Sequence, residues 1–119
     1  MNNDPFYQTA KWQRVRKKVL MRDKYMDAEL RRYGKLREAE VVHHIFPKDE
    51  FPQYAYELWN LISLTRSTHN AMHNRDYDEL SEKGIELLRR TCRKYNKEVP
   101  AKYQSKPKKG RKYRDGYVY

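Results

Sequence analysis

The sequence predicts an α+β fold: a small metal-centred core of two short strands and one helix, with flanking helices and a basic C-terminal tail. The first observation is that all four histidines lie between Val41 and Arg75. The second is the order of two short apolar runs and a capped helix within that stretch. The third is composition, because 38% hydrophobic and 36% charged residues in a chain of 119 allow only a small core.

The residues before the histidines predict a basic helix. Thr9 can cap a helix over about 10–22. Four apolar residues recur in it at helical spacing: Trp12, Val15, Val19 and Leu20. Lys and Arg residues occupy other positions of this helix, and they form either a solvated face or a face that contacts DNA phosphates. The candidates for contact with phosphate are Lys11, Arg14 and Lys18. Residues 1–8 are expected to be a loosely held arm.

A second short helix and the first strand should follow. The helix is expected over 27–33 and should end at Gly34. The first strand should lie within 36–45 and lead into adjacent histidines, His43 and His44. Residues 46–57 contain two prolines among acidic and aromatic residues, so we expect a loop there.

The second strand and its helix carry the other histidines. Asn60 precedes an apolar strand over 61–64, and Thr65 can cap the helix that follows. His69 and His73 are four residues apart, so on a helix both rings lie on one face and can share a cation. Such a pair on a surface helix is more often without a ligand, so the pair alone does not establish a site.

His43 and His44 add a constraint, because adjacent side chains on a strand point to opposite faces. Only one of them can readily join a metal held by His69 and His73, and the other is free for a different task, such as activating water. A structural zinc site of four histidines without a thiolate is unusual. Together these features favour a catalytic metal site with three protein ligands and an open position.

Three blocks of the sequence resemble the HNH nucleases, which have the ββα-metal fold. The blocks are VHHI at 42–45, WNLISL at 59–64 and RSTHN at 66–70. His73 resembles the second histidine of the metal-binding pair in the colicin-type DNases. Residues 6–23 resemble the lead-in helix of phage-type HNH endonucleases. The resemblance extends over roughly residues 5–75.

The resemblance implies a metal-dependent endonuclease that nicks or cleaves duplex DNA with weak sequence preference by a one-metal mechanism. We assign His44 as the general base and Asn60 as the residue that ties the loop and orients His44. We assign His43, His69 and His73 as ligands of one divalent ion, although the roles of His43 and His44 can be exchanged. Imidazole ligands suit zinc, nickel, copper, cobalt or manganese better than magnesium. Phage-type members often act beside a terminase, which makes terminase a candidate partner.

One departure concerns structural zinc. Many phage and bacterial members hold zinc with two CxxC pairs, and here these positions correspond to Asp27 with Leu30 and Thr65 with Thr68. The chain has one cysteine, Cys92, which we expect to be a buried core thiol rather than a nucleophile. We therefore expect the fold to be held by packing alone.

The C-terminal part predicts a helix and a tail. A polar break over 76–80 should precede a helix over 81–96, with Ile85, Leu88 and Cys92 on one side. Residues 97–119 contain eight Lys or Arg against two acidic residues and are interrupted by proline and glycine, so we expect a flexible tail. The expected division is a nuclease domain over 1–96, with its core at 36–75, and a tail that adds DNA affinity or only solubility.

A net charge of +11 and a pI of about 9.8 indicate a polyanionic partner. We expect double-stranded DNA rather than a membrane, because no long apolar segment is evident. Further candidate DNA contacts are Arg66, Arg75, Lys108, Lys109 and Arg111. The first residues show no signal peptide, so we expect the cytoplasm, that of a bacterial host if a phage encodes the chain. The alternative function is a non-catalytic DNA-binding module that is stabilised by metal. A third class, an RNA-binding protein, would explain the positive charge but not the spacing of the histidines.

Overall fold

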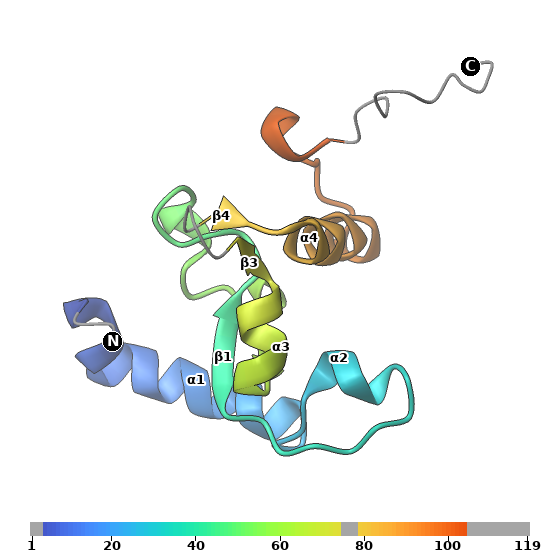
Figure 1. Cartoon of the computed structure of the whole chain (residues 1–119). Helices are drawn as coiled ribbons and strands as arrows, with labels where there is room; N and C mark the ends of the chain where they lie inside the picture. The colour runs from blue at the N-terminus through green and yellow to red at the C-terminus, as the bar shows by residue number, and fades with distance from the viewer. Residues whose placement is uncertain (1–3, 75–78, 105–119) are drawn as a thin grey trace.

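The structure, a computed structural model, describes residues 4–74 and 79–104 (Figure 1). Strand β1 (Val41–His44) pairs antiparallel with β2 (Leu61–Leu64), with Val41 opposite Leu64 and His44 opposite Leu61. Helix α3 (Arg66–Ala71) follows β2 and lies along β1 in the view of Figure 1. This is the predicted order of strand, loop, strand and helix, and the predicted α+β class is confirmed.

Helix α1 (Ala10–Arg22) begins where the sequence predicts, because the Thr9 side chain accepts a hydrogen bond from the backbone N–H of Trp12. Trp12 and Val19 are buried with Leu61 in a small core between α1 and the strands. Helix α2 (Ala28–Arg31) is shorter than predicted. The chain leaves it through Gly34, whose φ of +77° lies in the left-handed region that glycine tolerates.

The N-terminal residues 4–8 are not the loosely held arm that we expected. Pro5–Gln8 form a 3-10 helix (η1), capped by Asp4, whose carboxylate also pairs with Lys48 at 2.7 Å. The rings of Phe6 and Tyr7 pack against the indole of Trp12. The aromatic contacts hold this segment against α1, and sequence periodicity could not have indicated them.

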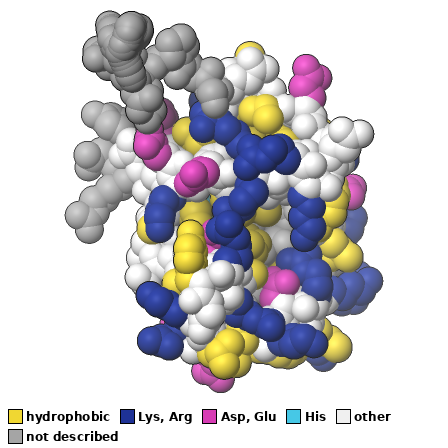
Figure 2. All heavy atoms as spheres, turned by 90° about the vertical axis from the view of Figure 1, so that its right-hand side faces the viewer, with side chains coloured by type: hydrophobic (Ala, Val, Ile, Leu, Met, Phe, Trp, Pro, Cys, Tyr) yellow, Lys and Arg dark blue, Asp and Glu magenta, His cyan; other side chains and the backbone are white. Residues whose placement is uncertain are grey.

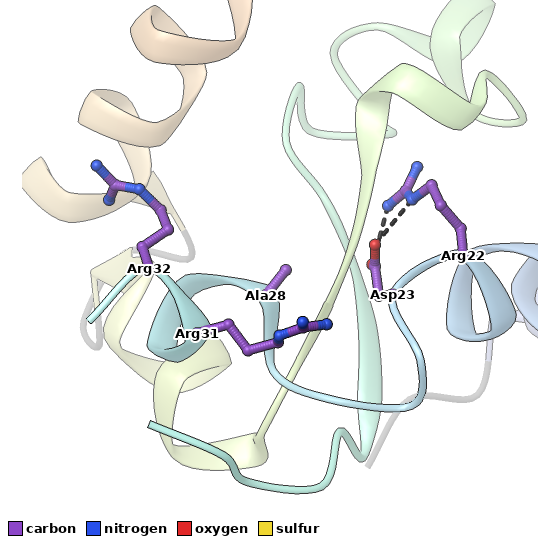
Figure 3. Close-up of a pocket in the computed structure, with 5 residues that line it drawn as sticks. All are labelled: Arg22, Asp23, Ala28, Arg31 and Arg32. Carbon is purple, nitrogen blue, oxygen red and sulfur yellow. Dashed lines mark hydrogen bonds and ion pairs between the residues drawn. The ribbon is translucent and has the colours of Figure 1, made fainter. Parts of the chain in front are cut away.

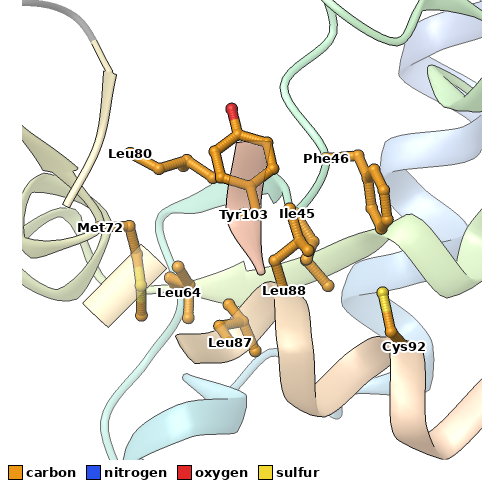
Figure 4. Close-up of a cluster of buried hydrophobic side chains, with 9 residues drawn as sticks. All are labelled: Ile45, Phe46, Leu64, Met72, Leu80, Leu87, Leu88, Cys92 and Tyr103. Carbon is orange, nitrogen blue, oxygen red and sulfur yellow. The ribbon is translucent and has the colours of Figure 1, made fainter. Parts of the chain in front are cut away.

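Helix α4 (Glu82–Tyr95) covers the main hydrophobic core (Figure 4). Ser81 caps its first turn, and Asn96 ends it in a left-handed conformation. The buried side chains of this core come from the ends of β1 and β2, the end of α3, β4 (Glu79–Leu80), α4 and the C-terminal segment: Ile45, Phe46, Leu64, Met72, Leu80, Leu87, Leu88, Cys92 and Tyr103. Cys92 is a buried core thiol, as expected.

The end of α3 differs from the prediction. The helix ends at Ala71, and His73–Asn74 instead form a short strand, β3, paired with β4 (Glu79–Leu80). The expected polar break is therefore wrong for residues 79–80, while 76–78 lie outside the described residues. The chain turns here because Met72 enters the core, and α4 approaches so closely that a Cβ on Gly84 would lie 2.3 Å from the Met72 carbonyl oxygen.

The flexible tail was predicted to begin at residue 97, but the ordered structure continues beyond that position. Residues Ala101–Tyr103 form a 3-10 helix (η4), and the Tyr103 ring is buried in the main core. Its hydroxyl donates to the Glu50 carboxylate at 2.5 Å, and its carbonyl accepts from Arg89 at 2.8 Å. The ordered domain therefore extends to residue 104 rather than 96, and the remaining residues of the predicted tail lie outside the described part.

A buried carboxylate joins the two positions that correspond to the CxxC pairs. Asp27 is fully buried, and its Oδ1 accepts from the Leu30 N–H while its Oδ2 accepts from the Thr65 N–H, both at 2.8 Å. The Thr65 hydroxyl in turn accepts from the Thr68 N–H at 3.1 Å. The expectation of packing alone is corrected, because one carboxylate links the start of α2 to the start of α3.

None of the helices in the described ranges is long and apolar enough to cross a membrane.

Candidate metal centre

Three histidines from three different elements meet beside α3. His43 comes from β1, His69 from α3 and His73 from β3. One ring nitrogen from each lies within 4.8 Å of the other two. The ring centroids of His43 lie 5.2 Å from those of His69 and His73, which are 4.9 Å from each other. These are the three residues that the sequence analysis assigned as metal ligands.

The path of the chain to His73 is not the one predicted. We expected His69 and His73 on one helical face, but α3 ends at Ala71 and His73 begins β3. The two rings nevertheless approach closely, with their Nε2 atoms 3.2 Å apart. The burial of Met72, which turns the chain, therefore brings His73 to the site by a strand instead of a helix.

Two of the three rings, those of His43 and His69, are held in the neutral form that binds metal. Burial, together with the neighbouring rings of His69 and His73, lowers the pKa of His43 well below its usual range. Burial, the His73 ring and the charge of Arg66 lower the pKa of His69 to about 4. A neutral imidazole has a free electron pair on one nitrogen, so near neutral pH the site offers ligands instead of cations.

The three histidines fit a divalent metal ion. The Nε2 atom of His43 is buried and has no hydrogen-bond partner within the described part of the chain. A buried polar atom without a partner costs about 1–3 kcal/mol, which coordination of a metal would offset. Three imidazoles also match the donor set of catalytic zinc sites and suit the first-row transition metals.

His44 lies apart from this cluster, on the other face of β1, as strand alternation requires. Its ring stacks on Trp12, with centroids 5.1 Å apart and 23° between the planes. Its Nε2 lies 3.1 Å from the carbonyl oxygen of Ala55. A carbonyl can only accept, so Nε2 carries the proton and Nδ1 is the basic nitrogen. Burial chiefly lowers the pKa of His44 to about 4, so this ring is also neutral near pH 7.

Asn60 holds the loop between the strands. It is fully buried, and its Oδ1 accepts from the Phe46 N–H at 2.7 Å. Its Nδ2 donates to the carbonyls of Phe46 and Tyr54, both at 3.2 Å. Asn60 thus joins the first residue of the loop to a residue near its end. Since Ala55 follows Tyr54, this loop also carries the carbonyl that fixes His44.

The candidate DNA contacts are only partly placed by the structure. Lys11, Arg14 and Lys18 are exposed on α1, and the Lys11 ammonium lies 4.1 Å from the centre of the Tyr56 ring. Arg66 is exposed at the first position of α3, close enough to influence His69. Four further candidates lie outside the described residues: Arg75, Lys108, Lys109 and Arg111.

Sequence reasoning missed the aromatic environment of His44. Phe6, Tyr7 and Trp12 all lie around this ring, with centroids 5.8, 6.1 and 5.1 Å away. Trp12 was identified only as an apolar position of α1. The contact joins residues that are far apart in the sequence, and neither residue type nor spacing indicated it.

Comparison with known proteins adds one solved structure. No protein-family profile matches the chain, and no curated protein matches it. The fold is similar to that in the crystal structure of the HNH endonuclease of the deep-sea thermophilic bacteriophage GVE2 with manganese ion. The match has a TM-score of 0.55 and 29% sequence identity, and it covers 71% of this chain and 80% of that chain.

Proposed function

We propose that this chain, an HNH endonuclease by its fold and its cluster of three histidines, is a metal-dependent hydrolase of DNA phosphodiester bonds. One observation carries the proposal: nitrogens of His43, His69 and His73 lie within 4.8 Å of one another. They do so in a fold similar to a phage endonuclease crystallised with manganese. The ligand would be one divalent ion per chain, with manganese, zinc, nickel or cobalt better suited than magnesium.

Imidazole ligands in their neutral form would bind a cation without reducing its charge. When bound, the ion supplies positive charge to the phosphoryl oxygens and the leaving oxygen of the scissile phosphate. The rings come from β1, α3 and β3, so correct pairing of both small sheets is required to form the site. The His43 Nε2 atom is buried without a hydrogen-bond partner among the described residues, which favours a metal ion as its partner.

We assign His44 as the general base that takes a proton from the attacking water. The Ala55 carbonyl holds the Nε2–H, so the proton from water would go to Nδ1. The stack on Trp12 fixes the plane of the ring. A pKa of about 4 keeps His44 unprotonated over the whole neutral range, so the base is always available although it is weaker than a free histidine.

Asn60 acts on the reaction through the loop. It bonds Phe46 and Tyr54 and so places the carbonyl of Ala55, which sets the tautomer of His44. Within the described residues its side chain has its partners among loop backbone atoms rather than at the histidine cluster. Asn60 is therefore a positioning residue in this proposal.

The substrate we propose is duplex DNA, bound with weak sequence preference. The net charge of +11 favours a polyanion, and exposed cations lie on α1 and at the start of α3: Lys11, Arg14, Lys18 and Arg66. Arg75, Lys108, Lys109 and Arg111 stay candidates on sequence grounds. Contacts to phosphates position a protein on DNA without reading bases, which agrees with weak preference.

The family resemblance adds a biological setting, phage genome packaging with terminase as the partner. Co-purification of the full chain with the terminase encoded beside it, if a phage encodes both, tests that setting separately from the enzyme activity.

The experiment that tests the proposed function is nicking of supercoiled plasmid DNA by the full chain. Activity should require added Mn²⁺ or another divalent ion, should stop with chelator, and should be lost in His69→Ala. Asn70→Ala is the matched control, because Asn70 is exposed on the same helix. A protein that binds metal and DNA but nicks under no divalent ion would instead be a metal-stabilised DNA-binding module.

A further inference from the structure

A basic pocket lies between the end of α1 and helix α2. It has a volume of about 370 Å³ and is lined by Arg22, Asp23, Ala28, Arg31 and Arg32 (Figure 3). Three guanidinium groups and one carboxylate give this lining a formal net charge of +2. None of these residues belongs to the metal centre or to the DNA contacts proposed above.

Two of the lining charges neutralise each other. Arg22 donates to both carboxylate oxygens of Asp23, at 2.8 and 2.9 Å. It also donates to the carbonyls of Leu58 and Leu61, at 2.8 and 2.7 Å. Burial alone would raise the pKa of Asp23, but the bonds from Arg22 and Ser63 lower it, so the carboxylate stays ionised. This pair is a structural clamp and forms a wall of the pocket.

The other two arginines are the source of the excess positive charge. Among the described residues, Arg31 has no acidic partner, and in Figure 3 its side chain extends along the pocket toward Asp23. Arg32 contacts Glu29 at the long distance of 3.5 Å, and Glu29 is held more closely by Arg90 at 2.6 Å. Both arginines are exposed, but in Figure 3 the Arg32 side chain points away from the pocket, so the donors of Arg31 are the ones available to an anion there.

The pocket lies close to the helix that carries a metal ligand. Ala28 follows Asp27, whose carboxylate accepts from the Thr65 N–H at the start of α3. The His69 N–H donates to the Thr65 carbonyl, so His69 lies about one turn further along α3, roughly 6 Å in rise. Arg66, which is exposed, occupies the first position of that turn.

The surrounding face is rich in cations. Figure 2 shows the side of the molecule that looks to the right in Figure 1, where α2 and α4 lie, and Lys and Arg side chains gather over it. No histidine is visible on this face. The pocket thus belongs to a basic surface that is separate from the metal centre.

We propose that Arg31 binds a backbone phosphate of duplex DNA at a place separate from the metal centre. The inference rests on the proposed function in taking DNA as the ligand. Guanidinium groups match the planar, two-point geometry of phosphate oxygens, and neighbouring phosphates of a bound duplex continue along its length. The contact would position the duplex without reading its sequence.

The test compares DNA binding by Arg31→Ala and Arg31→Lys with that by the wild-type chain. Alanine maintains the helix, so the change removes a charge and its donors with little effect on α2. Lys83→Ala is the matched control, because Lys83 is exposed on α4 and its loss also removes one positive charge. Affinity for a short duplex is measured over a series of salt concentrations, with chelator present so that no cleavage occurs.

Arg31→Ala should weaken binding roughly tenfold, as expected for loss of one charge-assisted contact. The slope of log affinity against log salt should become shallower by about one. Arg31→Lys should recover the slope but only part of the affinity, because lysine lacks the planar fork. Equal effects of Arg31→Ala and Lys83→Ala, or no effect of either, would overturn the proposal.

A second measurement separates this inference from the proposed function. The Nε–H signal of Arg31 in NMR spectra should shift when duplex is added to the metal-free protein, while the backbone amide signal of Lys83 stays constant. Shifts and weakened binding would support the phosphate site even in a protein that does not nick plasmid. Nicking by the wild-type chain with an unshifted Arg31 signal would support the enzyme and overturn the pocket.

Discussion

The carboxylate of Asp27 accepts a hydrogen bond from the backbone N–H of Thr65 across 38 positions of the sequence, at 2.8 Å. Its other oxygen accepts from Leu30, so one buried side chain joins the starts of α2 and α3. This link lies at positions where CxxC-containing members of the family bind zinc. It stabilises the base of the helix that presents His69.

Asp27→Ala should lower the free energy of unfolding by about 3 kcal/mol, because two backbone N–H groups lose their buried acceptor. Asp27→Asn should cost less, since the amide oxygen can still accept one of the bonds. Asp49→Ala is the control, because the Asp49 side chain is 92% exposed. Urea unfolding measures the stability of all three variants. An Asp27→Ala protein as stable as the Asp49→Ala control would contradict a stabilising role for the Asp27 hydrogen bonds.

Removing one imidazole should abolish metal binding. His69→Ala and His73→Ala should each reduce the stoichiometry from one divalent ion per chain toward zero, and plasmid nicking should be lost with it. Asn70→Ala should bind metal normally. Calorimetric titration with Mn²⁺ or Zn²⁺ gives the stoichiometry, and unchanged binding in both histidine variants would remove the basis for the ligand assignment.

His44→Ala should keep metal and DNA affinity but lower the rate of hydrolysis by about 10² to 10⁴, the usual effect of losing a general base. Metal and DNA binding do not depend on His44, because it lies on the other face of β1. Single-turnover nicking measures the rate. If His44→Ala loses the metal while His43→Ala keeps it, the two histidines have exchanged roles.

Stability of the metal-free protein should fall as the pH is lowered from about 6.5 to about 4. The folded pKa of His44 and of His69 is about 4, below the ordinary 6.5, so the unfolded chain binds more protons in this window. The stability that the neutral His44 and His69 rings contribute is fully present above pH 6.5 and is lost as the pH falls toward 4. Urea unfolding with chelator at several pH values checks the sign, and stability that rises on acidification would contradict it.

Truncation after Gln104 should leave the fold and metal binding intact but weaken DNA binding. The removed residues carry six Lys or Arg and one acidic residue, so the salt dependence should become shallower. Truncation after Asn96 is the contrast, because it also removes Tyr103 from the main core and should destabilise the protein. An unchanged salt slope in the first truncation would show that the removed residues do not contact DNA.

Features that depend on a few neighbouring residues could be predicted from the sequence. Thr9 and Thr65 each cap the helix that follows, because a cap bonds an N–H only three residues away. Alternation along β1 correctly separated His43 from His44. The order of histidines and asparagine indicated the family, and the meeting of His43, His69 and His73 agreed with it.

Contacts between distant residues were decided only by the tertiary structure. Helical spacing predicted that His73 would continue α3, but burial of Met72 turned the chain into β3. Composition placed Tyr103 in a flexible tail, yet its ring fills a space in the core that α4 leaves. The Trp12 stack on His44 and the Asp27 bond to Thr65 likewise join distant segments. Their free energy comes from burial that exists only after the elements have packed together, and no local pattern in the sequence encodes it.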